Sequence, residues 1–348
     1  MAAKAARACT YCRMGLGPAI LPSVFDGPAA VRRAIMQALV LRPDPRLAGL
    51  VRRGMGDADA TVRRNAVRAA GNLGAAAPVE ELQEALGAKS ANQHDVIRAL
   101  GAVGQPAAGI LRGYIKDGAG SAELEIEAML ALAPSAGRDD IGWIAKRLDA
   151  PDKHVRAAAA AALGHIGHPS AQAALMDRVD DPEPLVRATV ARALGQIGTV
   201  YASKQLVVML SDPSALVRSM AAWGLGHTGY SEASASLEGL AASPSAVSSE
   251  ARREGDVYGQ PRLAAVEALG RMSTVSAVEA LKGLADAPSW SVRAKAAKAL
   301  GATGTADGAV IASLENRLTD PVGLVRAESL LGLKALGKTY PPGHFQIP

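Results

Sequence analysis

The sequence predicts an all-α protein built from about ten copies of one helical hairpin, and three observations lead to this fold class. The segment DDPEPLVRATVARALGQIG, residues 180–198, returns 31 residues later as SDPSALVRSMAAWGLGHTG. A fixed short period of this kind indicates a stack of small units. Aromatic residues make up only 3% of the 348 residues, and alanine and leucine are abundant, which favours closely packed helices over sheets. Within one unit, apolar residues follow each other at helical spacings, as in Val186, Val190, Leu194 and Ile197.

The repeat can be followed along most of the chain by its Leu-Gly pair. Successive copies are 30 to 33 residues apart, except for one gap of 44 residues. The equivalent positions are Leu39, Ala70, Leu100, Leu132, Leu163, Leu194, Leu225, Leu269, Leu300 and Leu333. The long gap holds the polar segment SPSAVSSEARREG, which we interpret as an inserted loop at about 243–255. The predicted organisation is therefore a tail over 1–24, a repeat array over 25–338 and a second tail over 339–348.

Each unit carries the same signals for the start and end of its helices. Asp-Pro pairs at Asp181, Asp212 and Asp320 separate the two helices, because proline lacks a backbone donor and aspartate caps a helix. Glycine at the fourth place after the leucine is expected to end the second helix in the left-handed conformation. These glycines are Gly74, Gly104, Gly167, Gly198, Gly229, Gly304 and Gly337.

A Val-Arg pair recurs eight residues before the leucine. Its copies are Val31-Arg32, Val62-Arg63, Val155-Arg156, Val186-Arg187, Val217-Arg218, Val292-Arg293 and Val325-Arg326. Gln93 and Glu125 replace the arginine in the third and fourth repeats, and Pro261-Arg262 holds the place after the insertion. Because the arginine falls on the inward side of the helix, we expect a ladder of partly buried ion pairs with the Asp-Pro aspartates, and no catalytic role.

The Asp-Pro turn, the Val-Arg pair and the Ala-Leu-Gly element together resemble HEAT-like repeats, particularly the short bacterial type named after phycobilin lyases. The resemblance covers about residues 25–338. It implies a right-handed α-solenoid in which the second helix of each pair lines the concave face. Because that family includes scaffolds, chromophore lyases and DNA-binding proteins, the resemblance leaves the function open.

The residues two before and two after the leucine are expected to point out from the second helices. From them we predict a partner-binding surface of Arg68, Arg98, His165, Arg192, Gln196, Trp223, His227, Arg271 and Lys298. Trp223 is the expected anchor, because tryptophan and arginine on an exposed groove are typical of binding hot spots. The alternative is that Trp223 fills a gap left by the small neighbours Ala222 and Gly226. Trp143 and Trp290 are expected in core or cap packing.

The sequence offers few candidates for chemistry. It contains no His-Glu-x-x-His motif, no phosphate-binding glycine loop and no nucleophile elbow, so we predict no catalytic residues and no cofactor. His165 and His168 lie three residues apart, and we expect them at a solvated helix end. Cys9 and Cys12 have the spacing of half a zinc knuckle or a redox pair. We expect a reduced tail there, with a metal or cluster completed by another subunit as the alternative.

Positive charge is concentrated at the N-terminal end. Residues 1–68 hold twelve of the 38 Lys and Arg residues, against four aspartates, in a chain of net charge +5. We expect this end to attract an acidic partner. A nucleic-acid interface formed by arginines of the first repeats is a weaker alternative. These arginines are Arg32, Arg33, Arg52, Arg53, Arg63, Arg64 and Arg68.

The function predicted from the sequence is a non-catalytic scaffold or adaptor subunit that binds a partner protein. Membership of a larger complex is compatible with this function. The enzyme-class alternative is a bilin lyase-like or tetrapyrrole-binding protein that uses Trp223, His227, His165 and Arg192. No apolar run is long enough to span a membrane, and no continuous apolar segment follows the N-terminal basic residues. We therefore expect a cytoplasmic protein.

Overall fold

The computed structural model describes residues 17–88, 93–243 and 260–338, and every regular element in these ranges is a helix. The predicted all-α architecture of stacked helical hairpins is confirmed. The chain divides into two compact units, Met1–Asp140 and Ile141–Pro348, called unit 1 and unit 2 below. The predicted insertion from residue 244 onward, the pair Cys9 and Cys12, and the predicted C-terminal tail lie outside the described residues.

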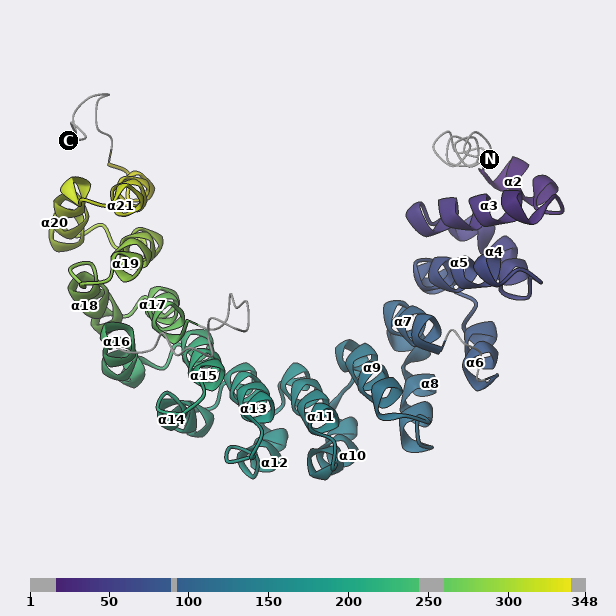
Figure 1. Cartoon of the computed structure of the whole chain (residues 1–348), viewed down its shortest axis with the longest axis horizontal. Coiled ribbons are helices and arrows are strands. Elements are labelled where there is room, and N and C mark those ends of the chain that lie inside the picture. Colours follow the sequence, from purple (N-terminus) through teal and green to yellow (C-terminus); the bar gives the residue numbers. More distant parts are fainter. Residues whose placement is uncertain (1–16, 89–92, 244–259, 339–348) are drawn as a thin grey trace. The chain divides into compact units, whose positions relative to one another are not determined.

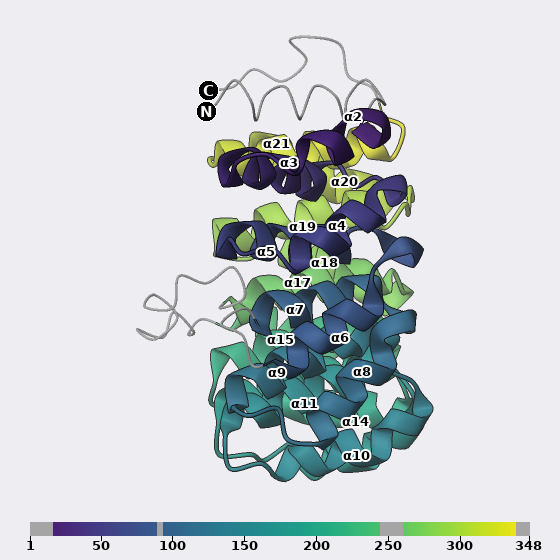
Figure 2. The same ribbon diagram turned by 90° about the vertical axis from the view of Figure 1, so that its right-hand side faces the viewer.

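Unit 1 contains four hairpins in its described part. The helices are α2 Gly17–Val24, α3 Ala29–Leu41, α4 Ala48–Met55, α5 Ala60–Gly71, α6 Val79–Gly87, α7 Gln93–Val103, α8 Gln105–Lys116 and α9 Ala122–Leu132. The second helices α3, α5, α7 and α9 pack against one another in chain order, as Figure 2 shows. Helix α2 lies within the predicted N-terminal tail, so the first hairpin begins earlier than the repeat pattern indicates.

Unit 2 contains six hairpins in its described part. The helices are α10 Ile141–Ala145, α11 Lys153–Ile166, α12 Gln172–Met176, α13 Pro184–Ile197, α14 Val200–Met209, α15 Ala215–Thr228, α16 Ser234–Ala242, α17 Pro261–Met272, α18 Val275–Leu284, α19 Trp290–Ala302, α20 Gly308–Asn316 and α21 Gly323–Ala335. The odd-numbered second helices form one row, and the even-numbered first helices form the other (Figure 1). The exposed side of the second-helix row is the surface on which most predicted binding residues lie.

The Leu-Gly pair holds neighbouring second helices together. Leu194 and Leu225 are completely buried in the core. The glycine after each leucine marks the place where the helices touch: a Cβ atom on Gly195 would lie 2.4 Å from the Cα of Gly224. Since real Cβ contacts are never this short, any larger residue at Gly195 would push α13 and α15 apart.

The predicted glycines adopt positive φ near the ends of the second helices, but the predicted aspartate caps are wrong. Asp181, Asp212 and Asp320 accept hydrogen bonds from the N–H groups of Glu183, Ser214 and Val322 in the turn, and α13, α15 and α21 begin without a side-chain cap. Asp152 caps α11 by accepting hydrogen bonds from the backbone N–H groups of His154 and Val155. Gly198 ends α13 with φ 72°, in the left-handed region. The other predicted terminating glycines also have positive φ; they are Gly74, Gly104, Gly167, Gly229, Gly304 and Gly337.

The predicted arginine ladder connects successive hairpins. Arg187 donates two hydrogen bonds to the Asp212 carboxylate, from Nε at 2.8 Å and from Nη2 at 2.9 Å. Its Nη1 donates to the carbonyl oxygen of Asp181, in its own turn, at 2.8 Å. Arg156 binds Asp181 in the same bidentate way, so each aspartate receives one arginine on its carboxylate and the next on its carbonyl. The ladder thereby links each Asp-Pro turn to the hairpins on both sides.

The ladder changes at the insertion. Arg218 donates to the carbonyl oxygens of Asp212 and Pro213, as the repeat requires. The residue that corresponds to the next ladder aspartate is Ser243, directly before the undescribed segment 244–259. The ladder resumes with Arg293, which binds Asp320 at 2.8 and 3.0 Å.

Replacing a ladder arginine should destabilise the protein strongly. The side chains of Arg187 and Asp212 are only 12% and 9% exposed, so Arg187→Ala leaves a nearly buried carboxylate without its partner. We expect the free energy of unfolding to fall by about 3 kcal/mol. In the matched control, Lys153→Ala breaks a pair whose partners are 46% and 39% exposed, and should cost less than about 1 kcal/mol. Urea denaturation measures both, and equal losses would contradict a structural role for the ladder.

Protonation of the ladder aspartates should weaken the fold. Hydrogen bonds from Arg293 hold the pKa of Asp320 below its ordinary value of 3.8. Because this pKa is lowered by folding, the stabilisation is complete above 3.8 and is lost as the pH falls through the folded-state value. Asp320→Asn should therefore be much less stable than the wild type near neutral pH, and the difference should shrink at pH values below 3.8. A difference that stays constant in denaturation curves across this range would contradict the expectation.

Candidate functional site

Two pockets open between second helices of unit 2, one on each side of Trp223. The first, called the apolar pocket, has a volume of about 460 Å³ and lies between α13 and α15. Its lining residues are Leu185, Ala188, Thr189, Arg192, Leu216, Met220 and Trp223. The second, called the charged pocket, has a volume of about 540 Å³ and lies between α15 and α17. Trp223 and Met220 line both pockets, and the two together are called the Trp223 groove below.

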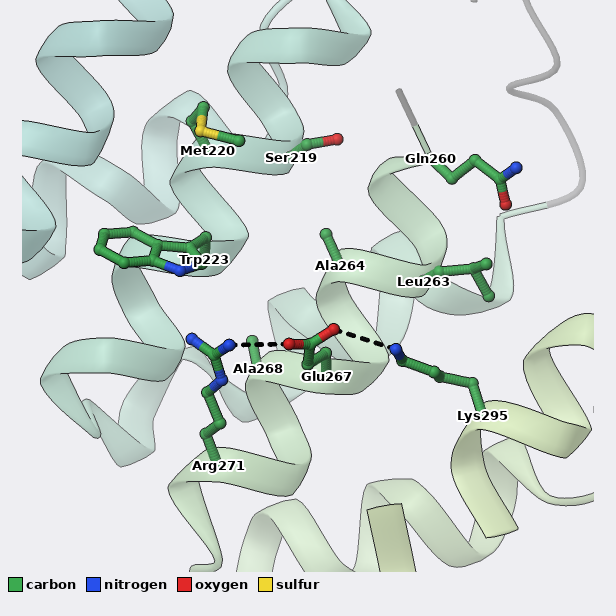
Figure 3. A pocket seen from close by; sticks show the side chains of 10 residues that line it. All are labelled: Ser219, Met220, Trp223, Gln260, Leu263, Ala264, Glu267, Ala268, Arg271 and Lys295. Carbon is green, nitrogen blue, oxygen red and sulfur yellow. Dashed lines mark hydrogen bonds and ion pairs between the residues drawn. The ribbon is translucent and has the colours of Figure 1, made fainter. Parts of the chain in front are cut away.

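The charged pocket is drawn in Figure 3. Helix α15 supplies Ser219, Met220 and Trp223 to its wall, and helix α19 supplies Lys295. The residues from α17 and the turn before it are Gln260, Leu263, Ala264, Glu267, Ala268 and Arg271.

Local packing turns Trp223 outward. Its neighbours on the same helix, Ala222 and Gly226, are buried against other helices, and the indole occupies the outward position between them. The ring is half-buried and stacks on the imidazole of His227, one turn further along α15, with centroids 5.2 Å apart and planes 9° from parallel. Trp223 therefore forms a shared wall of two surface pockets and does not fill a gap in the core.

The charged pocket contains a compact arrangement of ion pairs. Glu267 accepts a hydrogen bond from Arg271 at 2.7 Å and forms an ion pair with Lys295 at 3.0 Å. Lys295 first, and Arg271 in addition, hold the pKa of Glu267 below its ordinary value. Glu267 is therefore ionised at neutral pH and balances one of the two cations, so the cluster has a net positive charge.

Ser219 contributes an unusual polar group to the charged pocket. Its side chain is 1% exposed, and its hydroxyl has no hydrogen-bond partner among the described residues. The buried serines Ser203 and Ser329 instead donate to the carbonyl oxygens of Thr199 and Val325, one helical turn earlier. The places equivalent to Ser219 in α11, α13 and α19 hold alanine, at positions 157, 188 and 294. Ser219 therefore places a hydroxyl on the wall of the charged pocket where these three repeats have a methyl group, and no described residue forms a hydrogen bond with it.

The predicted binding residues occupy different surroundings. Arg192 and Trp223 meet in the apolar pocket, Arg271 and Trp223 meet in the charged pocket, and His227 stacks on the indole. The remaining predicted residues of unit 2, His165, Gln196 and Lys298, line neither pocket. Arg68 and Arg98 belong to unit 1, on α5 and α7.

Gln196 is not oriented as predicted. It is half-buried, and its side chain packs against Gly164 of α11, where the Oε1 atom has no hydrogen-bond partner among the described residues. Trp290, for which core or cap packing is expected, is the first residue of α19, with 50% of its surface exposed, so it lies at the helix start and not in the core.

Residues one helical turn before the predicted ones also line the pockets, although the sequence pattern did not indicate them. Ser219 and Met220 lie four and three residues before Trp223, and Lys295 lies three residues before Lys298. Residues three and four apart share one face of a helix. Extending each outward position by one turn toward the N-terminus would therefore have found the pocket walls.

The basic arginines of unit 1 are engaged within the unit. Arg32 binds Asp57, Arg33 binds Asp59 and Arg53 binds Asp26. Arg52 pairs with Glu81, while Arg64 and Arg68 share Asp95. Arg63 donates to the carbonyl oxygens of Asp57 and Ala58. These seven arginines each have a carboxylate or carbonyl partner nearby, which weakens the field that they present to a nucleic acid or an acidic protein.

The described residues contain no group of three His, Cys, Asp or Glu side chains arranged to hold a metal ion. His168 caps a short 3-10 helix by accepting a hydrogen bond from the backbone N–H of Ser170. In the described part of the chain, no helix has the length and apolar character needed to cross a membrane.

Removing the unpartnered hydroxyl should stabilise the protein. Ser219→Ala introduces the residue found at this place in four other repeats, at positions 157, 188, 294 and 327, and eliminates a buried polar atom without a partner among the described residues. We expect the free energy of unfolding to rise by about 1 kcal/mol. Thermal or urea unfolding measures the change, with Ser329→Ala as the control, which should be destabilising because that hydroxyl donates to Val325. A loss of stability in Ser219→Ala would mean that the hydroxyl has a partner in the folded chain.

The repeats match a known family over most of the chain. The family model for HEAT repeats matches residues 18–101, 114–187, 141–208, 179–254 and 249–334. No curated protein matches the chain.

Several solved structures are similar to the chain. An engineered protein has 20% sequence identity and a TM-score of 0.45, over 92% of this chain and 94% of its own. The complex of CpcE and CpcF of phycocyanin lyase from Nostoc sp. has 20% identity and a TM-score of 0.42, over 74% of this chain and 94% of its own. Human deoxyhypusine hydroxylase has 21% identity and a TM-score of 0.30, over 84% of this chain and 96% of its own. The family match along the chain, together with the repeated hairpins, shows that this protein belongs to the HEAT-repeat family.

Proposed function

We propose that this protein is a non-catalytic scaffold or adaptor subunit that binds a partner protein in the Trp223 groove. The observation that best supports this proposal is the position of Trp223, a half-buried tryptophan between two pockets on the exposed side of the second helices. Large aromatic residues beside arginine and methionine are enriched where protein partners bind. Trp223 has both kinds of neighbour, Arg192 and Met220.

The packing of unit 2 supports a binding role for this surface. Helices α13, α15 and α17 are held in close contact through glycines, as at Gly226 and Ala268, where an added Cβ would lie 2.6 Å from the Ala268 Cα. A surface on closely packed helices changes little on binding and loses little entropy. The groove is therefore preorganised for a partner.

The chemistry of the groove favours binding over catalysis. Ser219 is the hydroxyl candidate for a nucleophile, but no base hydrogen-bonds to it among the described residues. Glu267 is engaged by two cations, which lowers its basicity. A nucleophile needs an adjacent base or a lowered pKa to react, and the described pocket walls supply neither for Ser219.

Trp223→Ala should weaken partner capture by about 2 kcal/mol while leaving thermal unfolding nearly unchanged. Alanine is compatible with this place, because Ala161 occupies it in α11. The full chain and the variant are immobilised and exposed to native extract, and the retained proteins are quantified by mass spectrometry. Trp290→Ala is the matched control, since it removes a half-exposed tryptophan of unit 2 that lines neither pocket. Equal capture by wild type and Trp223→Ala would contradict the proposal.

The tetrapyrrole-binding alternative predicts a different result. A bilin mixed with the purified protein should then show a shifted absorption band that Trp223→Ala abolishes. The scaffold proposal expects no shift.

A further inference from the structure

We propose that the segment bound by the Trp223 groove is an acidic stretch of polypeptide that inserts two apolar side chains, one into each pocket. This inference rests on the proposed function and names the chemistry of its partner. Three independent features of the groove support it: the division into two pockets, the balance of charge and the unpartnered hydroxyl of Ser219.

The division into two pockets requires two anchors. Trp223 and Met220 stand between the pockets, so a segment that crosses α13, α15 and α17 must pass over them. Leu185 and Leu216 line the apolar pocket, and Leu263 contributes an apolar side chain to the charged pocket. Each volume is large enough for a leucine or an aromatic side chain. A segment with one apolar residue on each side of Trp223 would bury surface in both pockets.

The charge around the groove favours carboxylates. Arg192 lines the apolar pocket and has no ion-pair partner among the described residues. Across the groove, Arg271 and Lys295 share the single carboxylate of Glu267. Both pockets therefore have a net positive charge, whereas the seven unit 1 arginines considered above already have partners. An acidic segment can pair with Arg192 without breaking an existing interaction, and a basic segment would be repelled.

Ser219 indicates where the main chain or a polar group of the partner lies. The hydroxyl belongs to the wall of the charged pocket, and in Figure 3 it points from α15 toward the side of α17. A buried donor without a partner is costly, and a bound group that accepts its hydrogen bond removes that cost. A carbonyl or carboxylate oxygen of the partner provides such an acceptor, while a purely apolar ligand does not.

The test uses a display library of random peptides, about 12 residues long, selected on the full chain and counter-selected on Trp223→Ala. The expected peptides carry two large apolar residues at a constant separation and an excess of aspartate and glutamate. A synthetic member of the selected set is then titrated by fluorescence anisotropy. If Trp223→Ala does not fold, Arg192→Glu with Lys295→Glu replaces it in the counter-selection, because both side chains lie on the surface of the groove.

Charge reversal and hydroxyl removal test the details of recognition. The double variant Arg192→Glu with Lys295→Glu should bind the selected peptide at least about tenfold more weakly than the wild type. Lys204→Glu, an exposed lysine on first helix α14, is the control and should change affinity less than about twofold. Ser219→Ala should bind the selected peptide about fivefold more weakly than the wild type, although the variant is expected to be the more stable protein.

The outcomes separate this inference from the proposed function. Suppose that peptides bind in a Trp223-dependent way but are basic or neutral, or carry a single apolar residue. This result would overturn the inference of an acidic segment with two anchors, while the proposed partner-binding function would still stand. If no peptide depends on Trp223, both proposals fail. Tighter Trp223-dependent binding of a thymidine oligonucleotide than of any selected peptide would also overturn the inference, in favour of nucleic acid.

Discussion

The close contact of successive second helices at the Leu-Gly pair is the constraint on which the rest of unit 2 depends. Gly195 approaches Gly224 so closely that a Cβ atom on Gly195 would lie 2.4 Å from the Gly224 Cα, and the adjacent leucines Leu194 and Leu225 are fully buried. The short separation brings the outward faces of neighbouring helices within reach of one another. Side chains from α13 and α15, or from α15 and α17, can then line a single pocket. The binding surface is therefore a consequence of how the core packs.

The arginine ladder provides a second, electrostatic connection between hairpins, and in unit 2 it is interrupted at the insertion, next to the groove. Arg187 joins two Asp-Pro turns, whereas the position that would continue the ladder from Arg218 holds Ser243. The same part of the chain carries Trp223 and Ser219, where the preceding repeat has Arg192 and Ala188. In a repeat protein each unit contacts mainly its neighbours, so local departures change one surface without disturbing distant units. The groove is such a departure.

Identical residue types have different roles in the two units because their neighbours differ. Arg32 and Arg33 face aspartates of the following turn, which satisfy them within the fold. Arg192 points from a second helix into a pocket whose other walls are largely apolar, and has no described carboxylate to bind. The same residue type is therefore satisfied inside the fold in one unit and left available in the other. The charge available to a partner is the part that remains after internal pairing.

The sequence by itself determined the hairpin, its period, its terminating glycines and the ladder, because these depend on local propensity and on contacts repeated at one spacing. It also placed Trp223, Arg192 and Arg271 on the exposed face, since that assignment needs only the helical period. Only the tertiary structure decided that Gln196 turns toward Gly164, that Ser219 lacks a partner and that Lys295 reaches Glu267 from a different helix. Those features depend on the distance between helices and on which atoms face each other across it, and neither quantity is encoded in the spacing of residues along one chain.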